Sequence, residues 1–418
     1  MVATTPNTDR VVFIGAAGEM CRVAIERFAR ADGDWPLVLA DIRPELLEPL
    51  MATLPAGRAT AVRADLFDPA SLADLVAGAA LVVLGAGPYI RTSEPVIDAC
   101  LAAGVPYLDF DDDVESTEHA LGLDERAKAA AIPLYIGCGA SPGMSNVMAV
   151  DAAGDLDEVD AIDLAWLVGE ERPNVGRAVI EHMLHISAGE CVTWENGQRT
   201  MHETFVETLP VPIVAGEPDR LLYETAHPEP VTLPRKYPGA ERIRCVGGLD
   251  PVAMNGLFRG VALAMQRGDL STEQGIDFVH GVAVGGMGNL SGWRAAARGM
   301  VGQIRRGEMR PGSAFLFAAK SAVRQLFPYK GGLVASAYGL ADGKPARSTR
   351  RMAMNPDGPM NNMGGVTGTA CAAFAVLALD QSGSRTGAFA PEDWAEPAAF
   401  YRALERVGVP RRDIVETI

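Results

Sequence analysis

The 418-residue chain is 48% hydrophobic and 22% charged, which is typical of a folded protein and too apolar for an intrinsically disordered one. Its length favours two domains over one. The formal net charge of −16 argues against a nucleic-acid partner, because a phosphate backbone requires a basic surface.

Cysteine spacing and the N-terminus give the expected compartment. Six cysteines are spread along the chain with no C-x-x-C pair, which favours reduced thiols over disulfides and predicts no metal site. The first residues lack the basic start and apolar core of a signal peptide. No apolar run reaches the roughly 20 residues that span a bilayer, and 369–379 is predicted to be a core helix. We expect a cytoplasmic protein without a membrane partner.

Strand and helix patterns alternate through the first 150 residues. Strands are predicted at 11–15, 37–41, 59–65, 80–87, 105–110 and 132–139, and helices at 21–31, 45–54, 69–78, 93–104 and 124–131. Apolar strands separated by amphipathic helices are typical of a parallel sheet covered on both faces. Right-handed crossovers make this a doubly wound, Rossmann-type α/β domain.

The pattern changes after about residue 150. Residues 159–169 alternate apolar and polar side chains, as in a half-buried strand, and 176–189 have a helical pattern. Residues 332–354 predict a hairpin that turns at Ala341-Asp342-Gly343. The expected organisation is a Rossmann domain, an inserted α/β domain with a mixed sheet, and a segment that packs back on the first domain; the ranges are 1–150, 151–355 and 356–418.

The turn GAAGEMC follows the first strand and has two glycines three residues apart. Gly15 allows the chain to reverse, and Gly18 allows backbone N–H groups to approach a pyrophosphate at the positive end of the next helix. Cys21 occupies the place of the last glycine in a G-x-x-G-x-x-G pattern. Alone, the turn fits a cofactor site or a tight structural turn. As a cofactor site it would use Gly15, Ala17, Gly18, Glu19 and Met20.

The ends of the next strands carry residues suited to the rest of a dinucleotide. Asp41 ends the second strand, 26 residues after Gly15, where an acid binds the adenosine ribose. The third strand ends at Asp65 and Leu66, where the adenine ring would lie. The fourth strand ends at Ala86, Gly87 and Pro88, beside the nicotinamide position. Because the ends of parallel strands converge on one crevice, these residues together predict a dinucleotide site.

The choice between NAD and NADP depends on two residues at the end of the second strand. The carboxylate of Asp41 would repel a 2′-phosphate, which favours NAD. Arg43 offers that phosphate a cationic ligand, so NADP stays as the alternative.

Two longer runs carry a family resemblance. They are LGAGPYIRTSEPVIDACLAAGVPYLDFDDD (84–113) and LDERAKAAAIPLYIGCGASPGMSNVMA (123–149). In both, the chain resembles the saccharopine dehydrogenase/lysine dehydrogenase-like superfamily. The matching features are the Pro88-Tyr89 pair that ends the fourth strand and the turn Gly139–Asn146 that leaves the first domain. Cys21 departs from the family's usual glycine in the phosphate turn.

The resemblance implies a nicotinamide-binding domain completed by the C-terminal segment, and an inserted domain for substrate binding and dimerisation. It also implies hydride transfer at a carbon–nitrogen bond and a homodimer. Tyr89 matches the family's aromatic position, where substrate and nicotinamide meet, and Asp124 matches a site residue. Asp124 also opens a helical pattern, so an N-cap role is the other interpretation.

Other candidates come from the residues themselves. The acidic run Asp109, Asp111, Asp112 and Asp113 follows the fifth strand, and Asp111 is a candidate base or ammonium ligand within a loop that is otherwise solvated. His182 and His185 share a helix face and are either a proton shuttle or a structural pair. Weaker candidates are His227 and Glu229 as a cap or a loop anchor, Arg235 and Arg244 as a carboxylate clamp, and Cys138 as a buried thiol.

The favoured function is an NAD(P)-dependent oxidoreductase that acts on the C–N bond of an amino acid, opine or polyamine-like amine. No tyrosine is followed by a lysine four residues later, so a short-chain-type proton donor is not expected. One alternative is a homospermidine-synthase-like or cyclodeaminase-type enzyme that keeps NAD as a prosthetic group. Another is a non-catalytic dinucleotide sensor.

Overall fold

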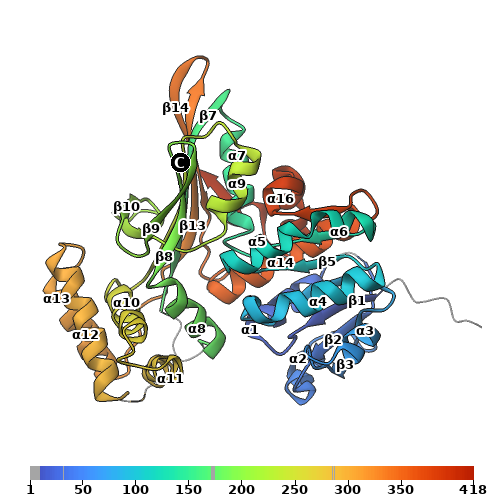
Figure 1. Cartoon of the computed structure of the whole chain (residues 1–418), viewed down its shortest axis with the longest axis horizontal. Coiled ribbons are helices and arrows are strands. Elements are labelled where there is room, and N and C mark those ends of the chain that lie inside the picture. Colours follow the sequence, from blue (N-terminus) through green and yellow to red (C-terminus); the bar gives the residue numbers. More distant parts are fainter. Residues whose placement is uncertain (1–9, 32, 171–174, 285, 287) are drawn as a thin grey trace, which may run out of the picture. The chain divides into compact units, whose positions relative to one another are not determined.

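The computed structural model describes residues 10–31, 33–170, 175–284, 286 and 288–418. The chain divides into two compact units (Figure 1). Unit 1 contains 1–151 and 355–416, and unit 2 contains 152–354 and the last two residues. The expected boundaries after 150 and 355 each lie one residue from these divisions.

A seven-stranded sheet forms the centre of the described part of unit 1. From edge to edge its strands are β15 (Gly387–Phe389), β6 (Pro133–Tyr135), β5 (Tyr107–Asp109), β4 (Ala79–Leu84), β1 (Arg10–Ile14), β2 (Leu37–Asp41) and β3 (Ala59–Arg63). All neighbours are parallel. The strand order reverses between β1 and β4, which is the switch point where doubly wound sheets bind ligands. The predicted Rossmann-type fold is confirmed.

The helices of unit 1 cover both faces of this sheet. They are α1 (Glu19–Phe28), α2 (Glu48–Met51), α3 (Pro69–Val76), α4 (Tyr89–Ala103), α5 (Val114–Gly122), α6 (Asp124–Ala129), α7 (Met144–Ala153), α14 (Met363–Asp380), α15 (Pro391–Trp394) and α16 (Pro397–Arg406), with 3₁₀ helices η1 (Pro44–Leu47) and η2 (Arg411–Asp413). Because α1 leads from β1 to β2 and α4 leads from β4 outward to β5, right-handed crossovers put α1 and α4 on opposite faces.

The C-terminal helix α14 packs against α1. It is long and apolar enough to meet the criteria for a membrane span, but 83% of that stretch is buried inside the protein. A Cβ on Gly368 would lie 2.4 Å from the carbonyl oxygen of Met20, so only glycine lets the two helices approach this closely. The core helix predicted over 369–379 therefore lies within α14 and packs in the first domain, as expected.

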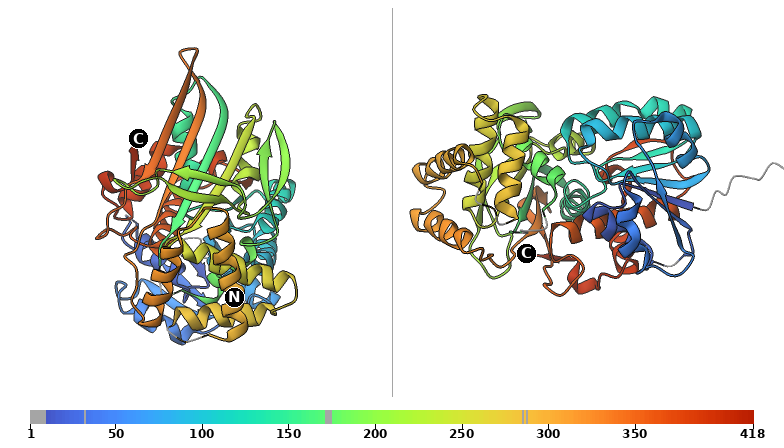
Figure 2. Two further views of the ribbon diagram at one scale, coloured as in Figure 1. Left: turned by 90° about the vertical axis from the view of Figure 1, so that its left-hand side faces the viewer. Right: turned by 90° about the horizontal axis from the view of Figure 1, so that it is seen from below.

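The second sheet has nine strands among the described residues and is mixed. In order they are β10 (Thr208–Val211), β11 (Arg220–Glu224), β12 (Arg242–Leu249), β7 (Glu158–Val168), β13 (Gly332–Ala341), β14 (Lys344–Met352) and β16 (Val415–Thr417). In addition, β8 (Glu190–Glu195) pairs with β12, and β9 (Gln198–Glu203) pairs with β8. The long strands β7, β13 and β14 run side by side (Figure 2, left). The sheet is mixed because β7 pairs in parallel with β12 but antiparallel with β13.

Unit 2 also contains six described helices: α8 (Arg177–Ile186), α9 (Glu229–Lys236), α10 (Ala253–Gln266), α11 (Thr272–Ala283), α12 (Leu290–Arg305) and α13 (Pro311–Ala322). One face of the sheet carries an apolar cluster that includes Ala165, Leu167 and Val246. Since side chains alternate along a strand, Trp166 and Cys245 face the opposite side. The predicted mixed α/β domain is confirmed.

Two local expectations differ from the structure. The helix expected from 93 begins at Tyr89, directly after Pro88. The strand expected through 139 ends at Tyr135, because Gly137 has a positive φ of 73° and turns the chain. The turn at Asp342 and Gly343, with φ of 50° and 68°, is confirmed.

Candidate functional site

The turn between β1 and α1 is held close to the end of β4. Gly15 has φ of +75°, and a Cβ there would lie 2.7 Å from Cβ of Ala86. Gly18 is the N-cap of α1, and no described side chain caps that helix. Its first N–H groups are therefore available to an external anion, at the positive end of the helix dipole. This arrangement fits a pyrophosphate.

Cys21 fits the turn because a glycine, Gly85, follows β4. A Cβ on Gly85 would lie 2.8 Å from both Cβ and Sγ of Cys21, so Gly85 makes the room that the family's usual glycine in α1 would otherwise provide. Burial raises the pKa of the Cys21 thiol, with Asp41 adding to the effect. Cys21 is thus an uncharged packing residue and leaves the phosphate turn open.

Asp41 ties the phosphate turn to the end of β2. Its Oδ2 accepts a hydrogen bond from the Ala17 N–H at 3.0 Å, and its Oδ1 accepts one from the Arg43 N–H at 3.0 Å. The Arg43 side chain is exposed. The carboxylate therefore lies beside the turn, where a ribose hydroxyl would be bound.

The side chain of Glu19 points toward the neighbouring helix. A Cβ on Gly364, in the first turn of α14, would lie 3.3 Å from Glu19 Oε1. Burial raises the pKa of Glu19. Of the turn residues, Glu19 therefore offers a bound phosphate its backbone, while its carboxylate lies against α14. Met20 is half-buried beside it and contributes its carbonyl to the same helix contact.

Apolar side chains are exposed at the two strand ends nearest the expected adenine. Asp65 is exposed and its Oδ1 accepts a hydrogen bond from the Phe67 N–H at 3.0 Å. Phe67 is 68% exposed and Ile42 is 45% exposed, with Leu66 half-buried between Asp65 and Phe67. Because β2 and β3 are parallel neighbours, Ile42 and Leu66 leave the sheet at the same edge. The sequence places an apolar residue just after each strand-end acid, with Ile42 next to Asp41 and Phe67 two residues after Asp65.

The loop after β4 is fixed by the helix that follows it. The Thr92 hydroxyl donates to the carbonyl oxygens of Ala86, at 2.5 Å, and Pro88, at 3.1 Å. Gly87 between them is exposed. The loop thus presents backbone and small side chains at the position expected for nicotinamide.

Tyr89 begins α4 and is buried. Its hydroxyl donates to the Leu84 carbonyl oxygen at 3.4 Å, and its ring lies edge-on to Phe110 at 5.9 Å. Burial raises the pKa of Tyr89 well above its usual value, and the carboxylates of Asp109, Asp112 and Asp111 raise it further. The structure therefore brings the expected aromatic residue and the acidic run together.

Asp109 and Asp111 are both fully buried after β5. Asp109 accepts hydrogen bonds from the Tyr107 hydroxyl and the Gly137 N–H, each at 2.7 Å, and from the Asp111 N–H at 3.2 Å. Asp111 accepts one from the Asp113 N–H at 2.9 Å. Burial raises the pKa of Asp109 to about 6 despite its donors. Burial, then the charge of Asp109, raises the pKa of Asp111 well above its usual range.

The raised pKa of Asp109 predicts a pH-dependent stability. The folded protein keeps this proton up to about pH 6, whereas the unfolded chain loses it near the ordinary value of 3.8. The free energy of unfolding therefore falls as the pH rises through this window. We expect Asp109→Asn, which has no charge to bury, to gain on the order of 1–3 kcal/mol over wild type at pH 7.5. Thermal unfolding at pH 4.5 and 7.5 measures the gain, and a difference independent of pH would contradict it.

The turn Gly139–Asn146 is fixed by the C-terminal segment. Gly143 has φ of +126°, and a Cβ there would lie 2.0 Å from the Gly139 carbonyl oxygen. Asn146 accepts a hydrogen bond from the Gly143 N–H at 2.9 Å and donates one to Glu392 at 2.8 Å. Cys138 before the turn is buried, and burial raises the pKa of its thiol, consistent with a packing role.

Asp124 has structural contacts. Its Oδ1 accepts a hydrogen bond from the Ala388 N–H of β15 at 2.9 Å, and its Oδ2 lies 2.7 Å from the Lys128 ammonium. It is the first residue of α6, but the N-cap is Leu123 and makes no side-chain cap. The hydrogen bond to Ala388 joins α6 to β15. Asp124 thus has a structural role, but it is not an N-cap.

The other candidates lie in unit 2. His182 and His185 are on α8, where His185 is exposed and the His182 ring lies 6.1 Å from that of His227.

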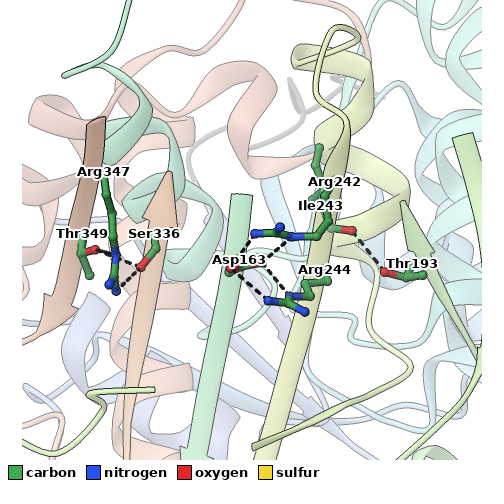
Figure 3. A network of polar contacts seen from close by, with 8 residues as sticks. All are labelled: Asp163, Thr193, Arg242, Ile243, Arg244, Ser336, Arg347 and Thr349. Carbon is green, nitrogen blue, oxygen red and sulfur yellow. Dashed lines mark hydrogen bonds and ion pairs between the residues drawn. The ribbon is translucent and has the colours of Figure 1, made fainter. Parts of the chain in front are cut away.

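The arginine expected to bind a carboxylate is already engaged. Arg244 is paired with Asp163, Nε to Oδ1 at 2.7 Å, together with Arg242 (Figure 3). Arg235 is exposed on α9. Arg244 is thus engaged within its own sheet, and the carboxylate clamp is not preformed.

Comparison with known proteins agrees with this geometry. Residues 11–133 match the family model of the saccharopine dehydrogenase NADP binding domain. A putative trans-acting enoyl reductase from Mycobacterium tuberculosis is 28% identical over 172 residues, and a trans-acting enoyl reductase from Mycobacterium ulcerans is 27% identical over 170 residues. Each match covers 38% of this chain but only 41% and 35% of those proteins.

The fold has a counterpart over its whole length. The apo form of saccharopine dehydrogenase (L-Glu forming) from Saccharomyces cerevisiae superposes with a TM-score of 0.63 at 14% identity, over 98% of this chain and 100% of that one. The family model, together with the geometry of the phosphate turn, assigns an NAD(P) site to the first domain. Residues 11–133 thus match a saccharopine dehydrogenase NADP binding domain, and the chain as a whole shares the fold of saccharopine dehydrogenase.

Proposed function

We propose that the protein transfers hydride between NAD(P) and the C–N bond of an amine or imine, with a small amine or amino acid as substrate. The observation that carries the proposal is the buried acidic pair Asp109 and Asp111 next to Tyr89, at the strand ends beside the expected nicotinamide position. The bound nicotinamide would supply or accept the hydride, and the protein residues would position the substrate and manage its proton.

Charge favours a C–N substrate over other reducible groups. The charged groups that act most strongly on Tyr89 are carboxylates. When an amine loses hydride, its carbon–nitrogen unit becomes an iminium cation, which neighbouring carboxylates stabilise. Reduction of an activated C=C bond instead builds negative charge on an enolate, which the same carboxylates would destabilise.

Each part of the site has a role in this proposal. The N–H groups at the start of α1 bind the pyrophosphate, and Asp41 binds the ribose. The loop Ala86–Pro88 borders the nicotinamide. Asp111 exchanges the proton of the substrate nitrogen, because its raised pKa brings it closer to neutral pH, where a general acid or base works best. Tyr89 lines the position of the reacting carbon.

A second candidate is reduction of a C=C bond. The curated relatives are named trans-acting enoyl reductases. A protonated Tyr89 hydroxyl, kept so by its raised pKa, would serve as the proton donor or enolate ligand in that reaction.

Absorbance of the reduced nicotinamide separates these functions. In the first assay, the full chain is mixed with NAD or NADP and a panel of amino acids and amines. In the second, the reduced cofactors are added with keto acid–amine pairs, and in the third, with enoyl thioesters. Turnover of the amine or imine panel supports the proposal. Turnover of enoyl thioesters alone rejects the proposal in favour of the second candidate. Product formation without a net change of cofactor indicates NAD held as a prosthetic group. Tight cofactor binding with no turnover of any substrate indicates a sensor.

We infer that NAD is preferred over NADP, and Asp41→Asn tests this. Loss of the carboxylate charge should raise the affinity for NADPH relative to NADH about tenfold, roughly 1.4 kcal/mol, since repulsion of the 2′-phosphate is removed. Any weakening of the turn through the lost Ala17 or Arg43 contact affects both cofactors, so the ratio of the two Kd values is the measurement. Arg43→Ala should move that ratio in the opposite direction. An unchanged ratio in Asp41→Asn contradicts the placement of the ribose.

A further inference from the structure

Three side chains of metal-binding type meet in the interior of unit 2. His227 lies in the Pro-rich segment after β11, Glu229 begins α9, and Cys245 lies in the middle of β12. Their exposed fractions are 5%, 0% and 2%. Each residue offers one ligand atom, and these three atoms all lie within 4.8 Å of one another.

The fold explains why these residues meet. The Thr225 N–H donates to the Cys245 carbonyl oxygen at 3.2 Å, which holds the segment after β11 against β12. Two residues later the chain reaches His227, and Pro228 then starts α9, which packs over β12. Cys245 lies on the face of β12 opposite the apolar cluster that contains Val246, so its thiol points toward α9.

The separation of His227 and Glu229 suits metal coordination better than a direct hydrogen bond. His227 Nδ1 lies 3.5 Å from Glu229 Oε2, and Nδ1 makes no hydrogen bond within the described part of the chain. Zinc bond lengths of about 2.0–2.3 Å place neighbouring tetrahedral ligands about 3.4–3.6 Å apart. The observed separation matches that value.

Other buried polar atoms around His227 also lack a partner in the described structure. They are Trp166 Nε1 and Thr225 Oγ1, in residues that are 5% and 1% exposed. The Trp166 indole occupies the space above Gly247, where a Cβ would lie 2.0 Å from the ring, and its centroid is 5.3 Å from that of His227. Buried polar groups in native proteins are almost always hydrogen-bonded or bound to a ligand, so this cluster points to a bound group.

We propose that His227, Glu229 and Cys245 bind one divalent transition-metal ion of the zinc type. Imidazole, thiolate and carboxylate together form a borderline-soft ligand set that suits Zn²⁺ and excludes Mg²⁺ and Ca²⁺, which prefer oxygen ligands. Three protein ligands leave the fourth tetrahedral position for water or an exogenous group. No metal site was predicted from the sequence, since the ligands come from two segments and lack the spacing of a paired motif.

Metal content of the full chain is the first test. The protein is stripped with a chelator, loaded with Zn²⁺ or Co²⁺, and dialysed. We expect one metal ion per chain, and a thiolate-to-cobalt charge-transfer absorption in the cobalt form. Cys245→Ser and His227→Gln should bind the metal at least about 10–100-fold more weakly in competition with a chromophoric chelator. Cys191→Ser is the matched control, because Cys191 is a buried thiol in β8 of the same unit, and it should bind as wild type does.

The outcomes are distinct from those of the cofactor assay, because metal content is read without turnover. Failure of wild type to retain metal, a cobalt form without the thiolate band, or equal binding by Cys245→Ser and Cys191→Ser would each overturn the site. If Cys245→Ser does not fold, alkylation of wild type in mild denaturant replaces it. Zn²⁺ should then slow modification of Cys245 but not of Cys191, and equal rates would reject the proposal.

Discussion

Asp111→Asn is expected to lower kcat by about 10²–10⁴-fold while the protein stays folded and binds NAD(P) normally. Asparagine keeps the shape of the side chain, and its Oδ1 can still accept the hydrogen bond from the Asp113 N–H. It cannot exchange a proton, which is the role proposed for this buried acid. Initial rates with the substrate found in the panel, together with a fluorescence titration of NADH, separate the loss of kcat from any loss of cofactor binding.

Asp124→Asn is the comparison for this variant. Its carboxylate is engaged with Lys128 and the Ala388 N–H, and asparagine keeps the second contact, so this variant should change kcat less than about threefold. The pH profile adds a second measurement. Wild type should show an apparent pKa in kcat/KM from the coupled acidic pair, and Asp111→Asn should lose it. A normal kcat in Asp111→Asn, or an equal loss in Asp124→Asn, contradicts the proton-transfer role.

The arrangement of the proposed cofactor site was predictable because each of its parts follows from local sequence. Gly15, Asp41 and the loop at Ala86 each lie at the end of a strongly apolar strand, and parallel strands bring such ends to one edge. Only long-range packing explained why Cys21 is tolerated in α1. The room comes from Gly85, which is more than 60 residues away in the chain. No local pattern connects the two residues.

The elements that were missed have weak apolar patterns. The buried face of α5 consists of Val114, Ser116, Thr117 and Ala120, which gives little hydrophobic periodicity. The start of α4 likewise buries Thr92 and Ser93 with Tyr89, so the helix was predicted to begin four residues late. Small polar side chains can line a buried helix face when they hydrogen-bond to the preceding turn, as Ser93 does to the Tyr89 carbonyl oxygen at 2.8 Å.

The cluster around His227 shows a different limit of sequence reasoning. His227 and Glu229 lie two residues apart in the sequence, which alone predicts a cap or a loop anchor. Cys245 comes from β12, and its position opposite His227 depends on the pairing of β12 with β11 and β7. Sheet pairing of this kind is a tertiary property, so a ligand set that depends on it has no sequence signature.

Gly368→Ala is expected to destabilise unit 1 and to weaken NAD(P) binding at least tenfold. A Cβ at this position would lie 2.4 Å from the Met20 carbonyl oxygen and 2.6 Å from Cβ of Val23, so α1 and α14 must separate. Overpacking of this kind costs about 1–3 kcal/mol, and alanine's helix propensity returns only about 1 kcal/mol. Cofactor binding should be affected because Met20 lies in the first turn of α1, whose N–H groups are proposed to bind the pyrophosphate.

Gly364→Ala is the matched control, one turn earlier on the same helix. Its Cβ would lie 3.3 Å from the flexible end of Glu19, which can move, so this variant should keep its Tm and its affinity. Thermal unfolding and NADH titration of both variants measure the two effects. If cofactor affinity falls in Gly368→Ala and not in Gly364→Ala, the position of α1 controls the phosphate site. If Gly368→Ala is destabilised yet binds NADH as wild type does, the N-terminus of α1 is held by the turn itself, through the hydrogen bond from the Ala17 N–H to Asp41. In that case α14 contributes only stability.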